Sequence, residues 1–568
     1  MHSKAEKWYT DSVVERRSGT QIKRRNLQKE TYVLEFCMPK GKSTKAVFKE
    51  YNQSQIELIP RTADELIPEK HLVRVVHETI EKMDLEPLLK QYRTGGGASR
   101  YAPLMLLKVF VYAYAVGVFS SRKIAKALRE NIYFMWLSGK QTPDFRTLNQ
   151  FRKTKLQPVM QEVFVSSVKL LSEAGYVRLD NYFLDGTKIE SRAGRYTFVW
   201  KGAVDTNEEK MDEKIRAYVQ EAERIAEEEN VMYGDEDLEE MGRGPITDEQ
   251  IQAMADKLSA VIAKLEKPSD EKPASHESKK KLLKMQKTFR EDFSERKKRY
   301  THHRAVLGER RSYAKTDRDA TFMRMKEDHM RNGQLKPGYN VQVGTENSFV
   351  LSYSIHHHPT DTRTLPLHLE KLKKEHGKLP RNLIADAGYG SEQNYEYLEE
   401  QGITTYVKYG TYKHEIKRRN KKNRYKAYRW TYDADRDELT CPEGKKLTYQ
   451  RTTEYRSDAG YRSSRRIYRC DDCDVCPVKH DCTQASYRHT AFSPRLWKQK
   501  QLVKERLSSP DGIALRKRRC HEVETVFGQI KGNMGFRRFR TAGKTGVSTE
   551  WGLLMMGYNM KNLLRLGV

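Results

Sequence analysis

The sequence predicts an α/β protein in which a central sheet is flanked by helical segments. Two short apolar runs that each end in an aspartate, residues 182–185 and 383–386, have the composition of buried strands. Strand-like and helix-like stretches alternate around the second run, as expected for a sheet covered by helices on both faces. Residues 67–156 instead repeat apolar side chains at steps of three and four, which indicates a helical region.

The predicted element order can bring the two strand-end aspartates together. Residues 339–343 and 349–355 form two alternating runs around a Thr-Glu-Asn turn, so we expect two further strands there. Helices are expected over 364–374 and 392–400, and a strand over 404–408. Strand ends of such a sheet are where α/β proteins place their ligands, although a single Asp at a strand end is more often a turn former.

The helical region, taken as 51–175, contains a candidate DNA-binding motif. Ser120-Ser121 can cap a helix over 122–130, and residues 142–144 open another helix. This spacing fits a helix-turn-helix, and it fits a plain helical bundle equally well. The preceding residues, 1–50, are polar and basic and are expected to form a loosely ordered arm.

Two insertions are expected to interrupt the α/β core. Residues 201–334 are rich in Glu, Lys, Ala and Met and carry apolar residues at coiled-coil spacing, which predicts a helical hairpin. Residues 411–504 combine a basic stretch with a cluster of cysteines. The core itself is expected from three segments: 176–200, 335–410 and 505–568.

The cysteine cluster has the spacing of a metal site. Two residues separate Cys470 from Cys473 and Cys473 from Cys476, Cys482 follows after five more, and Cys441 lies upstream. In a cytoplasmic protein such clustering favours metal over disulfides, and four of the five thiols would complete a tetrahedral Zn²⁺ site. The other interpretation is free thiols. A sulfur-only site would stabilise a small insert and would not carry out chemistry.

The charge balance points to a polyanionic partner. Lys and Arg total 106 against 77 Asp and Glu, a formal charge of +29 that is spread along the chain. Such an excess is typical of proteins that bind nucleic acid. No apolar run approaches the roughly 20 residues of a membrane helix, and the N-terminus lacks a secretory signal. We therefore expect a soluble, cytoplasmic protein.

A third carboxylate completes a candidate metal site. Glu524 lies in a helix-like stretch beside an apolar stripe, and Lys531 follows it by seven residues, about 10 Å along a helix axis. Asp185, Asp386 and Glu524 offer the hard oxygen ligands that suit Mg²⁺ or Mn²⁺. Two such ions about 4 Å apart can activate a water or a 3′-hydroxyl and stabilise the leaving oxygen of an in-line displacement.

These motifs resemble those of DDE-type insertion-sequence transposases of the insertion-sequence 1182 group. The resemblance rests on Phe-Leu-Asp-Gly-Thr-Lys at 183–188, Leu-Ile-Ala-Asp-Ala-Gly-Tyr-Gly at 383–390 and Val-Glu-Thr-Val-Phe-Gly-Gln-Ile-Lys at 523–531. It covers nearly the whole chain. It implies an RNase H-like catalytic core with the first Asp on the first strand, the second Asp after the fourth strand, and the Glu on a later helix.

The resemblance also implies residues that contact DNA or zinc. Lys188 and Lys531 match family positions, and Lys188 is equally compatible with a plain surface lysine. Cys520 stands where related families have an arginine, so Arg519, or alternatively Arg516 or Arg518, would replace it. The zinc ligands of similar proteins correspond to four cysteines, with Cys470 left as a spare: Cys441, Cys473, Cys476 and Cys482.

The function implied is cleavage of double-stranded DNA at the terminal inverted repeats of a mobile element, followed by joining of the 3′ ends to target DNA. Asp185, Asp386 and Glu524 would hold two Mg²⁺ or Mn²⁺ ions for both steps. A homodimer would pair the two ends at the bacterial nucleoid. The alternatives are a nuclease of the same fold without strand joining, and an inactive DNA-binding regulator.

Overall fold

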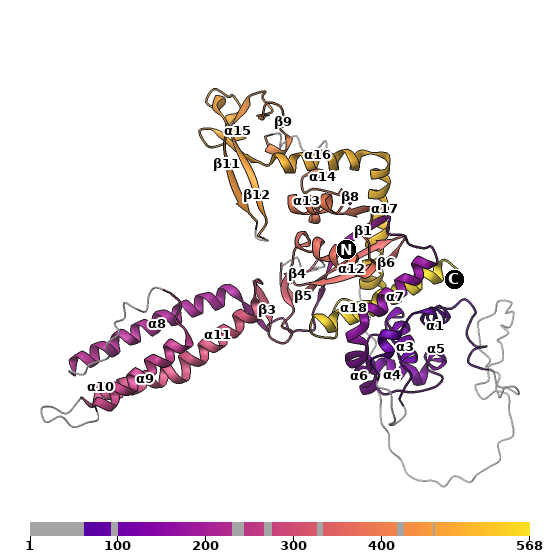
Figure 1. Ribbon diagram of the computed structural model, residues 1–568, viewed down its shortest axis with the longest axis horizontal. Helices are drawn as coiled ribbons and strands as arrows, with labels where there is room; N and C mark the ends of the chain where they lie inside the picture. Colours follow the sequence, from indigo (N-terminus) through magenta and orange to yellow (C-terminus); the bar gives the residue numbers. More distant parts are fainter. Residues whose placement is uncertain are drawn as a thin grey trace, which may run out of the picture. The chain divides into compact units, whose positions relative to one another are not determined.

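The computed structural model describes residues 62–567 except for the internal segments 93–99, 230–243, 266–274, 327–332, 417–424 and 458–459 (Figure 1). The expected basic arm at 1–50 and residues 417–424 of the basic stretch before the cysteines lie outside the described residues. The described part belongs to the second of two units, Arg61–Val568. None of its helices is both long enough and apolar enough to cross a membrane.

A six-stranded mixed sheet forms the centre of the fold. β1 pairs antiparallel with β5, and β5 pairs antiparallel with β4 and β6, whereas β1, β7 and β8 run parallel. The strands are β1 (Asn181–Glu190), β4 (Thr321–Arg324), β5 (Leu335–Glu346), β6 (Phe349–His356), β7 (Asn382–Ala385) and β8 (Thr404–Val407). This arrangement fits the RNase H-like core that the sequence motifs imply.

The first strand continues past the point where the sequence predicted its end. Asp185 is the fifth of the ten residues of β1, because the polar segment Gly186–Glu190 continues the antiparallel ladder with β5. The prediction that Asp185 ends a strand was therefore wrong. The apolar run ends at Asp185, but partners on β5 keep the chain extended beyond it.

Helices cover residues 72–173 and share one apolar core with the sheet. Gly557 on the C-terminal helix allows close approach, since a Cβ there would lie 2.9 Å from the backbone of Ala115. The helices are α1 (Leu72–Lys82), α2 (Glu86–Leu89), α3 (Pro103–Ala115), α4 (Ser121–Glu130), α5 (Ile132–Leu137), α6 (Phe145–Gln150) and α7 (Met160–Glu173). The Asp144 side chain caps α6 by accepting the N–H of Thr147.

The first insertion has an apolar core of its own. In its described residues the chain forms three helical rods, one more than the two of the predicted hairpin. The rods are α8 (Lys201–Glu228), α9 (Asp248–Leu265), and a continuous third rod of α10 (His276–Lys287), a π-helical turn and α11 (Ser294–Leu307). The strands β2 (Phe198–Trp200) and β3 (Ser312–Ala314) pair at the base of the insertion.

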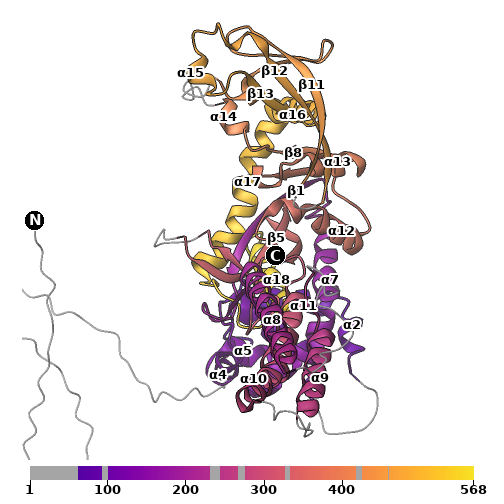
Figure 2. The ribbon, with the colours of Figure 1, turned by 90° about the vertical axis from the view of Figure 1, so that its left-hand side faces the viewer.

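The cysteine-rich region forms a five-stranded antiparallel sheet in the order β13, β12, β11, β10, β9. β11 and β12 make a long hairpin (Figures 1 and 2). The strands are β9 (Thr431–Asp433), β10 (Glu438–Thr440), β11 (Lys446–Arg456), β12 (Arg462–Cys470) and β13 (Arg488–Phe492). Three long helices then complete the chain: α16 (Pro494–Ser508), α17 (Pro510–Gly528) and α18 (Lys544–Arg565).

A buried polar chain connects β1 to β6 through α12 (Leu365–His376). The Tyr182 hydroxyl lies 2.7 Å from Nε2 of His368, and Ser354 Oγ lies 2.8 Å from Nδ1 of His368 and 2.6 Å from Nε2 of His356. Burial lowers the pKa of His356 to about 3. His356 is therefore neutral in the folded protein, where it contributes to packing within the sheet.

We expect His356 to make folding sensitive to acid. Because its pKa is lower in the folded state than the ordinary 6.5, its stabilising effect is complete above pH 6.5 and is lost as the pH falls towards 3. The loss amounts to about 5 kcal/mol over that interval. Urea unfolding at pH 7, 6, 5 and 4 should show a weaker pH dependence for His356→Gln than for wild type.

Exposed His480 provides the control for this comparison. His480→Gln should unfold with the pH dependence of wild type. A His356→Gln protein with an unchanged pH dependence would show that His356 does not titrate on unfolding.

Candidate active site

The strand register places two aspartates side by side. β1 and β7 pair in parallel up to Leu184 and Ala385, so the next residue on each strand is an aspartate. Asp185 continues in β1 and is buried, with its Oδ1 accepting the N–H of Gly186 at 2.7 Å. Asp386 leaves the sheet, and its half-exposed carboxylate accepts the N–H of Gly388 at 2.8 Å.

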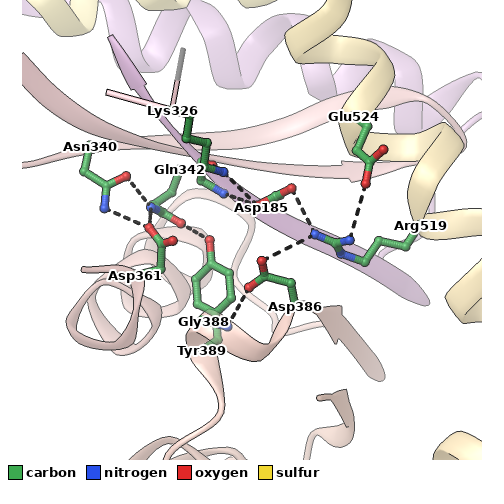
Figure 3. Close-up of polar contacts among 11 residues, drawn as sticks. Asp185, Lys326, Asn340, Gln342, Asp361, Asp386, Gly388, Tyr389, Arg519 and Glu524 are labelled. Carbon is green, nitrogen blue, oxygen red and sulfur yellow. Dashed lines mark hydrogen bonds and ion pairs between the residues drawn. The ribbon is translucent and has the colours of Figure 1, made fainter. Parts of the chain in front are cut away.

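A buried polar network holds the loop that carries Asp386 (Figure 3). The Tyr389 hydroxyl donates a hydrogen bond to Oε1 of Gln342, whose Nε2 donates to Oδ1 of Asp361 at 3.0 Å. Asn340 donates to the same Asp361 oxygen at 2.8 Å. The residue that follows Tyr389 has to be glycine, because a Cβ at position 390 would lie 2.3 Å from the carbonyl oxygen of Lys408.

Glu524 reaches the aspartates because its helix packs directly on their strands. Val523 of α17 forms a small apolar cluster with Phe183 of β1 and Ile384 of β7. The next residue in α17 is Glu524, whose side chain is 58% exposed and turned towards the same place as the two aspartates (Figure 3). Sequence reasoning thus identified three carboxylates that the structure brings together.

The guanidinium of Arg519 lies between the three carboxylates. Its Nη2 is 2.9 Å from Oδ2 of Asp185 and 3.9 Å from Oδ2 of Asp386, and its Nη1 is 3.7 Å from Oε1 of Glu524. Of the three arginines that the sequence left as alternatives, Arg519 is the one at the site. Arg518 instead pairs with Glu522 at 2.8 Å, and Arg516 lies over the Tyr412 ring.

Burial controls the protonation of the innermost carboxylate. Desolvation raises the pKa of Asp185 above its ordinary value, while the positive charges of Arg519 and Lys326 oppose that shift. A cation held at this position therefore stabilises the ionised form of Asp185.

The carboxylates open into a pocket of about 640 Å³ whose walls are strongly basic. Lys531, predicted to contact DNA, is one of the lining residues. Lys188 does not line the pocket. Successive side chains of a strand point to opposite faces of the sheet, so Lys188 of β1 points away from the face that carries Asp185 and Thr187. Sequence reasoning missed further basic lining residues that the fold gathers from distant segments: Lys326, Lys408, Lys413 and Arg537.

The three carboxylates have the chemistry of a site for divalent cations. They converge on one positive group, the Arg519 guanidinium, which shows that this position favours a cation. As the side chains lie, however, no three His, Cys, Asp or Glu residues in the described part of the chain are close enough together to hold one metal ion. The donor set fits Mg²⁺ or Mn²⁺, and Arg519 stands where the ions would bind.

All five clustered cysteines line one small pocket in the second insertion. The N–H of Arg488 lies 3.3 Å from Sγ of Cys473, a contact that would suit a thiolate. The thiols are gathered but, among the described residues, no three of them are spaced around a single ion. The zinc site stays a prediction.

Two family models match parts of the chain. A transposase DDE domain matches residues 440–564, which include α17 with Glu524, and a transposase domain (DUF772) matches residues 61–154. The matches support a DDE-type transposase, and such domains in general belong to metal-dependent enzymes that cut and join DNA. No curated protein and no solved structure matches the chain.

Proposed function

We propose that this chain is the transposase of an insertion sequence of the 1182 group. It binds the terminal inverted repeats, cuts the DNA at both ends, and joins the freed 3′-hydroxyls to target DNA. The observation that carries the proposal is the convergence of Asp185, Asp386 and Glu524 on one cationic group in a basic pocket. A homodimer at the bacterial nucleoid would process the two ends together.

Each carboxylate has a distinct role in this proposal. Asp185 is buried in the sheet and fixes the position of the site, whereas Asp386 and Glu524 are more exposed and can adjust to bound ions and DNA. Two Mg²⁺ or Mn²⁺ ions held by the three side chains would activate the attacking oxygen and stabilise the leaving oxygen. No separate general base is then needed.

Arg519 competes with the divalent ions for the carboxylates. Its guanidinium neutralises part of their mutual repulsion and favours the ionised form of Asp185, against the desolvation that raises the pKa of that carboxyl. When ions bind, the guanidinium has to move away, and the nearest anions available to it are the phosphates of bound DNA. The DNA contact that the sequence assigned to Arg519 would then form after metal binding.

The basic walls of the pocket are suited to hold the DNA backbone beside the carboxylates. Lys531 and Arg537 lie on the C-terminal side of α17, and Lys408 follows β8. Burial, and then the charge of Arg519, lower the pKa of Lys408. A phosphate in the pocket would relieve this repulsion between cations. The N-terminal helices would recognise the repeats.

A DNA assay tests the proposed function. The purified protein is incubated with Mg²⁺ and DNA that carries the inverted repeats flanking its gene, together with a target plasmid. We expect cleavage at the repeat ends and covalent joining of those ends to the plasmid. Cleavage without joined products would indicate the nuclease alternative, and binding without cleavage would indicate a regulator.

We also propose that Cys441, Cys473, Cys476 and Cys482 bind one structural Zn²⁺, with Cys470 as a spare thiol. Mass spectrometric metal analysis should find about one zinc per chain, and Cys473→Ser should lose it and melt at a lower temperature, because zinc binding contributes to folding. Cys520→Ser, at an exposed lone cysteine, is the matched control. Wild-type protein that contains no zinc after purification from zinc-supplemented medium would contradict this assignment.

A further inference from the structure

The hairpin of β11 and β12 extends beyond its sheet as a two-stranded ribbon (Figures 1 and 2). β10 pairs with β11 at positions 446 and 447, and β13 pairs with β12 from position 466 onward. Among the described residues, 453–456 and 462–465 pair with each other alone, whereas 451 and 452 pair with 467 and 466, which also pair with β13. One face of the ribbon, with residues 452, 454, 456, 462 and 464, is exposed, whereas Ser463 on the other face is buried. The exposed face and the polar backbone edge are open to a larger partner.

The ribbon carries concentrated positive charge. Arg451 at the base of the ribbon and Arg456 and Arg462 near its tip, which we call the ribbon arginines, are all exposed. No ion pair joins any of them to a carboxylate in the described part of the chain. Among the described residues of β11 and β12, Glu454 alone is acidic, so these strands carry little negative charge.

Two of the ribbon arginines face each other across the strands. The register places Arg456 directly opposite Arg462 on the same face of the ribbon. Like charges at such a position destabilise a β-ladder. An arrangement that weakens the isolated ribbon becomes favourable when an anion lies between or along the two guanidinium groups.

Aromatic side chains accompany the arginines. Tyr449 and Tyr455 of β11 are 44% and 43% exposed, and the Arg465 guanidinium lies 3.6 Å from the ring centroid of Tyr455. Hydroxyl and guanidinium groups together are the usual donors to phosphate oxygens in protein–DNA contacts. The ribbon thus has donors suited to a sugar-phosphate backbone.

The ribbon is attached to the catalytic region at its tip. The Tyr461 hydroxyl donates to Oε2 of Glu396 at 2.6 Å, and Arg495 pairs with the same carboxylate. Glu396 belongs to α13 (Glu392–Glu400), the helix that follows the Asp386 loop. This contact fixes the ribbon tip against the helix that follows the Asp386 loop.

We propose that the ribbon binds the backbone of duplex DNA through Arg451, Arg456 and Arg462. A two-stranded ribbon is of a size that the major groove of B-DNA admits, which brings its arginines near the phosphates on the groove walls. The choice of DNA as the polyanion rests on the proposed function. We assign these arginines to phosphates, because half to two-thirds of protein–DNA hydrogen bonds go to phosphate oxygens and sugar, and such contacts carry no sequence information.

Salt-dependent binding of the full chain to DNA tests the ribbon. Fluorescence anisotropy with a labelled duplex, in EDTA to prevent cleavage, compares wild type with the triple variant Arg451→Gln, Arg456→Gln and Arg462→Gln. Three lost phosphate contacts should reduce the slope of log affinity against log salt concentration by about 3 and weaken binding by roughly tenfold or more. Duplexes with and without the inverted repeat should lose affinity equally.

A control variant keeps the change in net charge the same. Lys210→Gln, Lys214→Gln and Lys284→Gln remove three exposed lysines from the helical insertion, and we expect the wild-type slope. Equal slopes for the ribbon and control variants would overturn the proposal, and so would a larger loss of affinity for duplex RNA than for DNA.

Failure of the ribbon proposal is separable from failure of the proposed function. If the wild-type protein cuts and joins DNA but both triple variants have the same salt slope, the ribbon proposal fails and the proposed transposase function stands. If the wild-type protein cuts no DNA but the ribbon variant alone has a reduced salt slope, the proposed function fails and the ribbon stands as a DNA-binding surface.

Discussion

Replacing Asp185 with Asn is expected to lower the rate of DNA cleavage at least about 10³-fold in Mg²⁺, equivalent to about 4 kcal/mol of transition-state stabilisation. The amide keeps an oxygen that can accept the N–H of Gly186, so the local fold should persist. It removes the negative charge that would hold the ions, and the loss should therefore appear in the chemical step. Single-turnover cleavage of end DNA measures it.

A carboxylate elsewhere in the same region provides the control. Glu505 on α16 is exposed and does not line the pocket, so Glu505→Gln should cut DNA at the wild-type rate. Circular dichroism and thermal unfolding should show that both variants are folded. Cleavage by folded Asp185→Asn at the wild-type rate would exclude this carboxylate from the chemistry.

Replacing Arg519 with Ala is expected to tighten the binding of Mn²⁺ by about tenfold, since a charged contact to a carboxylate is worth roughly 1.5 kcal/mol or more. The guanidinium now occupies the space between Asp185, Asp386 and Glu524, and its removal leaves the carboxylates to the ion alone. The paramagnetic resonance signal of free Mn²⁺ measures this affinity without any catalysis.

The same variant should fold less stably without metal. Asp185 would lose its buried partner, and unpaired buried charges destabilise proteins by several kcal/mol, so added Mn²⁺ should raise the melting temperature more than in wild type. Lys517→Ala, at an exposed lysine on the same helix, should bind Mn²⁺ like wild type. Weaker Mn²⁺ binding by Arg519→Ala would mean that the arginine supports the ions and does not compete with them.

Local patterns in the sequence were sufficient to predict most of the core. The helix over 392–400 coincides with α13, and the strands over 349–355 and 404–408 lie within a residue of β6 and β8. These elements carry their own signals, namely periodic apolar residues bounded by glycine or polar turns. Asp185 and Asp386 could be selected because each ends an apolar run, and Glu524 because its helix has an apolar stripe and because all three motifs resemble those of DDE-type transposases.

Features that depend on partners distant in the sequence could not be predicted in this way. β1 extends past Asp185 because β5 pairs with it, and nothing within β1 reveals that partner. The pocket gathers Lys326 and Arg537 from segments with no distinctive local pattern. The position of Arg519 likewise depends on how α17 packs over β1 and β7.

The ribbon illustrates the same limit. Its arginines are visible in the sequence as part of a basic, cysteine-containing region, but their pairing across two strands depends on the register of β11 with β12. A register shift of one residue would move each side chain to the other face. Arg456 and Arg462 become a facing pair only in the folded hairpin.

Metal rescue of Asp386→Cys tests most directly whether these carboxylates hold the ions that cut and join DNA. Asp386 is half-exposed, so the fold should accept the change, and a thiolate binds the softer Mn²⁺ better than Mg²⁺. We predict almost no cleaved or joined DNA in Mg²⁺ and substantial recovery of both products in Mn²⁺. Wild-type activity of the variant in Mg²⁺, or an equal loss in both metals, would contradict metal binding by Asp386.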